Sequence, residues 1–228
     1  MDEMRFFSAR AHQLLLPALL LAASLAAQQS PDSAPTSSSR AHKPAARLRP
    51  AGPSDGVLAD GVYHNAFFGF SCKLPYGWVD RSADMRADDQ PGKALLLFAI
   101  FERPPEATGD TVNSAVIITA ESASSYPGLR TAADYFGPLT ELATSKGFKL
   151  VNEPYAFPVG AKQLVRGDFS KQLGTLTMQQ SSLVLVEKGY VVSFTFIAGN
   201  DDEINSLIED LSFGATRKPD PAKIPAKK

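Results

Sequence analysis

The sequence predicts an α+β domain built on a largely antiparallel sheet that helices cover. Three observations lead to this fold class. Strand-like runs dominate residues 57–215, short turns separate most of them, and two amphipathic helix patterns interrupt them. Short connections favour antiparallel neighbours, because a parallel pair needs a long crossover. The 44% hydrophobic content and the 14 Phe are enough for a substantial core.

The predicted strands are runs of β-branched, aromatic and other apolar residues that end at turn residues. They are Val62–His64, Phe68–Leu74, Ala94–Phe101, Ser114–Ala120, Phe148–Glu153, Lys162–Phe169, Thr175–Glu187 and Tyr190–Ile197. Ala94–Phe101 is a continuous apolar run between proline-containing turns, which is typical of a central strand. Lys188-Gly189 predicts a hairpin turn, because glycine readily takes a positive φ.

The first predicted helix begins near Thr131 and ends at Gly147. Thr131 followed by Asp134 resembles a capping box, and Gly147 suits the position after the last helical turn. Gly137-Pro138 predicts a kink or a split, because proline cannot continue the helical hydrogen bonds. The apolar residues at helical spacing are Tyr135, Leu139 and Leu142.

The second predicted helix covers Asp201–Leu211. Asn200 and the acids after it are typical of an N-cap and a first turn, where negative charge complements the helix dipole. The apolar stripe consists of Ile204, Leu207, Ile208 and Leu211.

Residues 1–27 have the pattern of a secretory signal peptide. Arg5 and Arg10 provide positive charge, Leu14–Leu25 is apolar, and small residues suit cleavage near Ala27. The apolar stretch is shorter than the ~20 residues that a membrane-spanning helix needs. Gln28 stands where a bacterial lipoprotein has the cysteine that receives the lipid. We therefore expect an exported protein, periplasmic or extracellular, that is soluble, not lipidated and without a transmembrane segment after cleavage.

The rest of the chain divides by composition into a Ser/Pro/Ala-rich spacer (28–56), one domain (57–215) and a basic tail (216–228). The spacer and the tail have too few large apolar residues to fold, so we expect both to be disordered. The domain contains 12 Lys and Arg against 19 Asp and Glu, whereas 31–56 and 216–228 carry net charges of +2 and +4. An acidic domain argues against nucleic-acid binding, which needs a cationic folded surface. The basic ends either contact anionic envelope polymers and lipid headgroups or, as we favour, aid solubility.

Cys72 is the only cysteine, which rules out a disulfide within the chain. It alternates with Phe68, Phe70 and Leu74, so these side chains share one face of a strand. We expect a buried, unreactive thiol rather than one that pairs between chains, because free cysteines are among the most buried residues. We expect Phe70 and Phe194 to be buried as well.

Several short motifs, spread over residues 61–213, occur in an order that resembles one protein family. They are Tyr63-His64-Asn65, Phe68-Gly69-Phe70, Leu74-Pro75-Tyr76-Gly77-Trp78, Lys188-Gly189-Tyr190 before a Phe-rich strand, and Ser212-Phe213 after an amphipathic helix. The arrangement resembles the PsbP-like family, which comprises an extrinsic photosystem subunit and bacterial relatives such as the DcrB-type periplasmic proteins.

The resemblance implies an α/β/α sandwich around a central, largely antiparallel sheet of about six to eight strands. It also implies a role in binding or assembly without catalysis. The metal and photosystem contacts of the plant members have no matching residues in this sequence. None of them is therefore assigned here.

Two residues of the domain deserve consideration as catalytic groups. His64 is the only histidine in 57–215 and hence the only possible base for a Ser–His–Asp triad, while a multi-His zinc site is not possible. Ser71 lies in Gly69-Phe70-Ser71-Cys72-Lys73, which departs from the nucleophile motif G-x-S-x-G at its last position and lies within a strand. We expect both to be structural, and we assign no catalytic, cofactor-binding or metal-binding residue.

Acidic residues crowd a segment before Pro91 that we expect to be a loop. Asp84, Asp88 and Asp89 could hold Ca²⁺, but their spacing lacks the EF-hand pattern and Arg86 lies among them. A solvated loop is the favoured interpretation, and cation binding is the alternative.

Four aromatic residues, Tyr76, Trp78, Tyr126 and Tyr155, lie at predicted turns. We expect Trp78 to fill the edge of the core, because tryptophan is highly buried on average. The three tyrosines are the best indication of a surface that contacts carbohydrate or peptide.

The leading hypothesis is an exported, non-enzymatic binding or assembly module with a protein partner in the cell envelope. The alternatives are an extracytoplasmic hydrolase with a carboxylate-based site and a carrier of a small ligand or lipid. A broad apolar surface would favour the first, a cleft with two facing carboxylates the second, and an enclosed apolar cavity the third.

Overall fold

The computed structural model describes residues 52–54, 56–87, 94–104, 107 and 109–214. The expected signal peptide and basic tail lie outside these residues, as do Asp88 and Asp89. The elements form two antiparallel sheets and a few helices, so the predicted α+β class is confirmed.

The larger sheet has eight strands, in the order β4-β5-β6-β11-β10-β9-β7 with β8 also beside β9. They are β4 (Val79–Asp80), β5 (Leu95–Phe101), β6 (Ala115–Ser122), β7 (Lys149–Leu150), β8 (Tyr155–Val159), β9 (Lys162–Leu173), β10 (Leu176–Glu187) and β11 (Tyr190–Ala198). The smaller sheet has the order β1-β2-β3-β12, with β1 (Gly56–Ala59), β2 (Val62–Asn65), β3 (Phe70–Lys73) and β12 (Leu211–Phe213). The helical elements are α1 (Ser82–Ala87), η1 (Ala123–Ser125), η2 (Ala133–Tyr135), α2 (Phe136–Ser145) and α3 (Asp201–Glu209).

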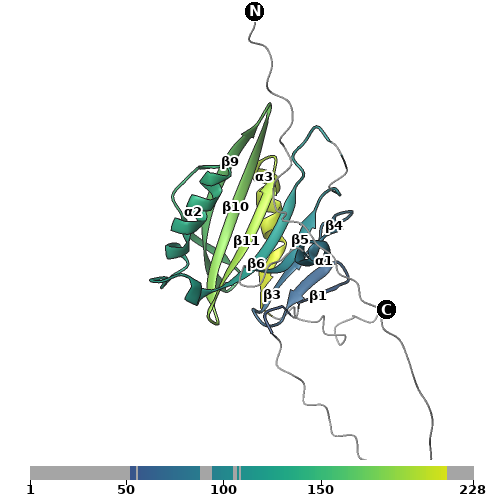
Figure 1. Cartoon of the computed structure of the whole chain (residues 1–228). Coiled ribbons are helices and arrows are strands. Elements are labelled where there is room, and N and C mark those ends of the chain that lie inside the picture. Colours follow the sequence, from purple (N-terminus) through teal and green to yellow (C-terminus); the bar gives the residue numbers. More distant parts are fainter. Residues whose placement is uncertain (1–51, 55, 88–93, 105–106, 108, 215–228) are drawn as a thin grey trace, which may run out of the picture. The chain divides into compact units, whose positions relative to one another are not determined.

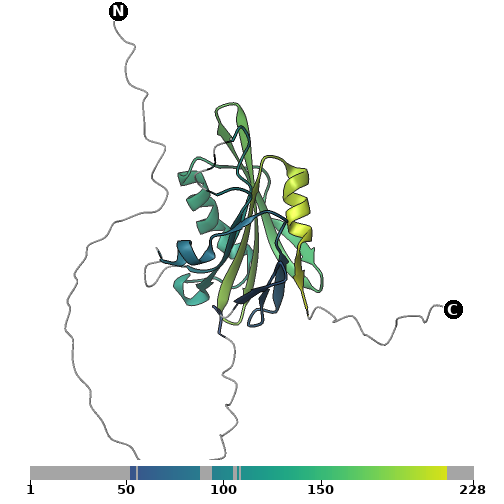
Figure 2. The same ribbon diagram turned by 90° about the vertical axis from the view of Figure 1, so that its right-hand side faces the viewer.

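Both faces of the larger sheet are covered, with α2 and α3 on opposite sides (Figures 1 and 2). The face toward α3 and the smaller sheet carries the main core, which includes Phe70, Phe98, Leu183, Phe194, Phe196 and Ile204. The opposite face packs against η2 and α2 through Tyr135, Phe136, Val184 and Val191. The expected burial of Phe70 and Phe194 is confirmed, at 3% and 0% exposure. The four-stranded sheet beside α3 was not expected, because the sequence indicated one sheet only.

Two hairpin turns use the same backbone conformation. At the β10–β11 turn Lys188 and Gly189 have φ angles of 52° and 78°, which confirms the predicted turn. At the β1–β2 turn Asp60 and Gly61 have φ angles of 51° and 72°. Asp-Gly is among the strongest signals for such a turn, so strand β1 was missed although the sequence marked it.

The predicted strand Phe68–Leu74 is shorter in the structure because the chain turns first. The Oδ1 atom of Asn65 accepts a hydrogen bond from the Phe68 amide at 3.0 Å, and Gly69 has a φ of 72°. Strand β3 therefore begins at Phe70.

The predicted strand Phe148–Glu153 is wrong in extent, since only Lys149–Leu150 pair with β9. The chain leaves the sheet over 151–154 and rejoins β9 as β8, which the sequence analysis missed. Pro154 and Pro158 explain the omission, because proline removes a ladder donor and is confined to positions such as edge strands.

The expected break in the first helix is confirmed. The chain forms the short η2 and then α2, in which Pro138 lies in the first turn, where a missing amide hydrogen costs no helical hydrogen bond. Gly147 ends the helix with a φ of 83°, as predicted. Leu142 was expected on the buried stripe but is 53% exposed, whereas Phe136 and Ala143 are buried.

The second helix begins as predicted, since the Asn200 Oδ1 atom accepts a hydrogen bond from the Glu203 amide at 2.9 Å. It ends at Glu209 rather than at Leu211. Leu211 begins β12, which pairs with β3 and places the Leu211 side chain in the main core. A third helix, α1, contains Asp84, so the expectation of a loop at this residue was wrong.

Candidate binding groove beside helix α2

Helix α2 is held close to the larger sheet by one glycine. A Cβ atom on Gly167 of β9 would lie 2.5 Å from the Phe136 ring, so only glycine leaves room for this ring on the strand. Phe136 is 3% exposed. From this contact, the rest of α2 runs along the edge of the sheet.

The start of α2 is fixed by two tyrosines that donate to one carboxylate. The Tyr135 hydroxyl donates to Glu121 Oε1 at 2.6 Å, and the Tyr126 hydroxyl donates to Glu121 Oε2. Their rings meet edge to face, with centroids 5.1 Å apart. Burial, and then the hydrogen bond to Glu121, raise the pKa of Tyr135. This phenol therefore stays protonated and acts as a fixed donor.

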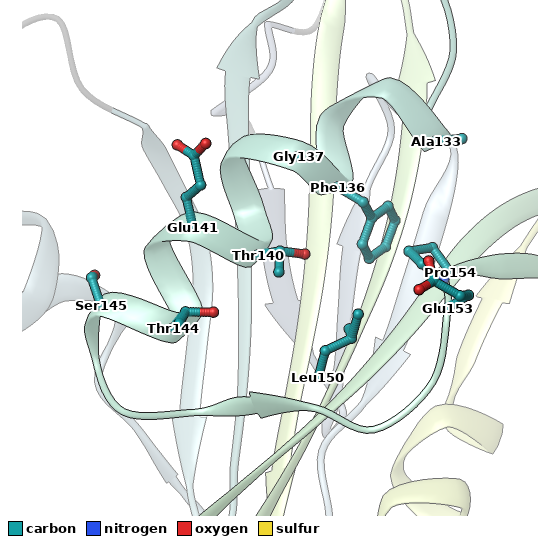
Figure 3. Close-up of a pocket in the computed structure, with 10 residues that line it drawn as sticks. All are labelled: Ala133, Phe136, Gly137, Thr140, Glu141, Thr144, Ser145, Leu150, Glu153 and Pro154. Carbon is teal, nitrogen blue, oxygen red and sulfur yellow. The ribbon is translucent and has the colours of Figure 1, made fainter.

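The chain that returns from α2 borders a groove of about 730 Å³ (Figure 3). We call this space the α2 groove, and its lining residues are Ala133, Phe136, Gly137, Thr140, Glu141, Thr144, Ser145, Leu150, Glu153 and Pro154. One wall is α2, and the other is Leu150 of β7 with the β7–β8 connection (151–154). The groove is open to solvent, and it is not an enclosed cavity.

The second wall is positioned by hydrogen bonds to one residue of β9. The Val151 amide donates to the Asp168 carbonyl oxygen at 2.8 Å. Asn152 Nδ2 and the Tyr155 hydroxyl donate to Asp168 Oδ2 at 3.1 and 3.5 Å. Glu153 and Pro154 lie between these anchored residues, so their place at the groove is set by the β9 strand.

Asp168 is itself held by a buried arginine. The Arg166 Nε atom donates to Asp168 Oδ1 at 2.8 Å, and its other nitrogens donate to Asn205 of α3 and Ser181 of β10, each at 3.0 Å. Arg166 is 8% exposed and lies 5.2 Å from the centroid of the Phe157 ring. The network joins α3, two strands and the groove wall, and its donors and acceptors are engaged with one another. We therefore interpret it as a support for the wall.

The groove combines an apolar floor with a polar rim. Phe136, Leu150 and Pro154 form the apolar part, and Thr140 and Thr144 place hydroxyl groups along α2. Both charged residues of the lining are glutamates. Figure 3 shows the Glu141 carboxylate directed away from α2 and the Glu153 carboxylate beside Pro154 on the other wall, so the two do not face each other.

His64 and Ser71 are cross-strand neighbours on β2 and β3. The Ser71 hydroxyl, however, pairs with the Ser212 hydroxyl at 2.9 Å. Across β1 the partner of His64 is Val57, so no acid stands in register beside this histidine. The pair lies on the smaller sheet, away from the α2 groove, and it does not form a triad.

The acidic and aromatic residues that the sequence suggested as candidate sites do not come together at one place. Within the described residues no group of three His, Cys, Asp or Glu is arranged to hold a metal ion. Trp78 packs against the main core, as expected. Tyr76 is fully exposed on the turn that leads to β4, whereas Tyr126 is engaged with Glu121. Tyr155 alone contributes to the groove, as an anchor of its second wall.

The groove residues themselves were not singled out by the sequence analysis. Ala133, Gly137, Thr140 and Thr144 follow one another at helical spacing, which indicates a helix face of small residues. That face gave no indication of the opposite wall, because Leu150 and Pro154 come to it only through the pairing with β9.

No family model and no curated protein sequence matches the chain. Solved structures do match it. The cyanobacterial PsbP of Synechocystis sp. PCC 6803 has 19% identity and a TM-score of 0.43, over 72% of this chain and 99% of that chain. LpqN of Mycobacterium tuberculosis, a protein involved in cell envelope biogenesis, has 14% identity and a TM-score of 0.35, over 64% and 83%. The Ran-binding protein Mog1p of Saccharomyces cerevisiae has 13% identity and a TM-score of 0.38, over 64% and 79%.

At these values the matches assign neither a family nor a function to the chain. The fold class stated above therefore comes from the observed sheets and helices. In the described part of the chain, no helix has the length and apolar character needed to span a membrane.

Proposed function

We propose that this protein is an exported, non-enzymatic binding module whose α2 groove holds an extended segment of a protein partner in the cell envelope. The observation that carries the proposal is the groove itself, with its apolar floor and its rim of hydroxyls and carboxylates. Its volume lies in the range of ~300–1,000 Å³ that is typical of ligand sites. Interfaces commonly combine an apolar centre with a polar rim in this way.

The shape of the groove favours a partner segment over the two alternative functions. A carrier of a lipid needs an enclosed apolar cavity, whereas this groove is open to solvent. A carboxylate-based hydrolase needs two acids that flank one bond, at a separation of about 5–10 Å. Glu141 and Glu153 are directed differently in Figure 3, so they do not offer that arrangement.

The proposal is tested by capture of partners from envelope extract with the mature protein. Thr144→Arg places a long charged side chain in the groove, and arginine is a good helix former, so the fold should be retained. Leu142→Arg is the matched control, because Leu142 is exposed on the same helix but does not line the groove. We expect capture to be lost with Thr144→Arg and retained with Leu142→Arg.

Two results would overturn the proposal. Capture that survives Thr144→Arg would show that the partner binds elsewhere. Turnover of a glycan, ester or peptide substrate that disappears with Glu153→Gln or His64→Ala would show that the protein is an enzyme. We expect His64→Ala to leave capture unchanged, because His64 lies on the smaller sheet and outside the groove.

A further inference from the structure

The two glutamates that line the α2 groove are not neutralised by the protein. Glu141 lies on α2 and Glu153 on the opposite wall, and within the described residues neither carboxylate accepts a hydrogen bond or an ion pair. By contrast, Glu121, Asp168 and Glu187 are engaged by a tyrosine, an arginine and a lysine. Complementary charge steers a partner to its site and suppresses wrong partners. The groove therefore favours a basic occupant over an acidic one.

Two hydroxyl groups on the α2 wall are available to the backbone of an occupant. Thr140 and Thr144 line the groove, and neither hydroxyl forms a hydrogen bond with the part of the chain that the structure describes. Residues four apart in a helix are separated by about 6 Å along its axis. In an extended chain, backbone groups on one side recur every second residue, at ~6.6 Å. The two hydroxyls can therefore bond successive backbone groups of one extended segment.

The length and the floor of the groove set the pattern of such a segment. The α2 wall, Phe136–Ser145, is about 15 Å long at ~1.5 Å per residue, which about five extended residues cover. Alternate side chains of an extended chain point to the same side, so the first, third and fifth residues face the groove together. The third lies over the apolar floor of Phe136, Leu150 and Pro154, and the outer two are left for the glutamates.

We infer that the α2 groove selects an extended partner segment with one aliphatic residue between two basic residues, each two positions away from it. The aliphatic side chain contacts the apolar floor, and the basic side chains pair with Glu141 and Glu153. The inference rests on the proposed function, because it specifies the chemistry of the partner segment that the groove holds.

Synthetic peptides test the pattern, with binding to the full mature protein followed by fluorescence anisotropy. The probe is the labelled peptide Arg-Ser-Leu-Ser-Arg, acetylated and amidated so that its termini carry no charge. We expect it to bind about tenfold more tightly than Glu-Ser-Leu-Ser-Glu, because two attractive contacts are replaced by two repulsive ones. We also expect Arg-Ser-Ser-Ser-Arg to bind about tenfold more weakly, because it buries no leucine side chain on the floor.

A charge exchange assigns the contacts to the groove. Glu141→Lys with Glu153→Lys should reverse the preference, so that the acidic peptide binds about tenfold more tightly than the basic one; both residues are exposed, so the fold should be retained. Asp202→Lys with Glu209→Lys is the matched control. It changes the net charge equally, but on α3, which lies on the other side of the larger sheet (Figures 1 and 2). We expect this control to keep the preference for the basic peptide. Binding of that peptide should also weaken at 1 M salt, where the screening length is about 3 Å.

Three peptide results would overturn the inference: no measurable binding of the basic peptide, equal binding of the basic and acidic peptides, or equal effects of the groove and α3 charge exchanges. The last would mean that the peptide follows the overall charge of the domain. Partner capture separates this inference from the proposed function. Capture that is lost with Thr144→Arg but retained with Glu141→Lys and Glu153→Lys refutes the basic segment and leaves the proposed function standing. Capture that survives Thr144→Arg overturns the proposed function itself.

Discussion

The contact between Gly167 and Phe136 makes a quantitative prediction about how α2 is held. A Cβ atom on Gly167 would lie 2.5 Å from Phe136 Cε1 and 2.9 Å from Cδ1. Both distances are well below van der Waals contact, so Gly167→Ala must displace the ring. The ring is 3% exposed between α2 and the strand, and it has little space into which it can move.

The magnitude follows from two opposing effects. Overpacking of a buried site destabilises a protein by about 1–3 kcal/mol. Alanine also restricts the unfolded chain, which stabilises the folded state by about 0.4–1 kcal/mol where the backbone is compatible. We therefore expect Gly167→Ala to lower the free energy of unfolding by roughly 1–2 kcal/mol, measured by urea denaturation at unchanged m-value.

A double-mutant cycle separates this clash from a general effect of alanine in a strand. Phe136→Ala alone should cost about 3–5 kcal/mol, the usual cost of a large-to-small core change. In the Phe136→Ala background, Gly167→Ala should cost nothing or should stabilise. Gly199→Ala, directly after β11, is the control for an added methyl group without a clash, since its Cβ would meet Val112 only at 4.0 Å. Equal destabilisation by Gly167→Ala with and without the Phe136 ring would contradict the predicted clash.

Four further predictions follow from the structure and the sequence. Gly137→Ala should change the free energy of unfolding by less than about 0.5 kcal/mol in urea melts, because the better helix propensity of alanine is offset by crowding of its Cβ against Pro138, while nothing else lies within 4 Å; a change above about 1 kcal/mol in either direction would contradict this balance. Phe70→Ala and Phe194→Ala should each cost about 3–5 kcal/mol, since the rings are buried and meet edge to face at 5.0 Å, and a cost below about 1 kcal/mol would mean that the strand faces are reversed. Burial raises the pKa of the Cys72 thiol from 9.0 to about 12, so the protonated thiol favours the folded state. This contribution to the free energy of unfolding is complete below pH 9 and is lost as the pH rises toward 12. Urea melts over this range should show a smaller alkaline loss for Cys72→Ala, and an identical loss would refute the assignment. The intact mass of the exported protein should correspond to cleavage near Ala27 without lipid, and a diacylglycerol adduct would contradict this.

The elements predicted correctly are those with strong local signals. Lys188-Gly189 gave the β10–β11 turn, and Asn200 gave the start of α3, because each has a backbone or side-chain preference that acts within a few residues. The missed elements depend on contacts that are distant in the sequence. Strand β12 continues directly from α3, and it becomes a strand only because β3 is there to pair with it.

Leu142 shows that local spacing in the sequence also has a limit as a predictor within a helix. Its spacing from Tyr135 and Leu139 fits an apolar stripe, and yet it is 53% exposed. The break before α2 changes the phase of the helix, so the buried face is defined by Phe136 and Ala143 instead. A pattern that spans a proline therefore predicts the existence of a helix better than it predicts the face that is buried.

The α2 groove depends both on local sequence features and on contacts between residues that are distant in the sequence. Its first wall follows from local features, since small residues at helical spacing leave room beside α2 and Gly167 lets the helix approach the sheet. Its second wall follows from the Asp168 network, which holds the β7–β8 connection at a distance from the helix. If the wall is set in this way, Asp168→Asn should weaken partner capture without any contact with the partner. Thr144→Arg should weaken capture by filling the groove directly, so the two variants together separate the shape of the site from its occupation.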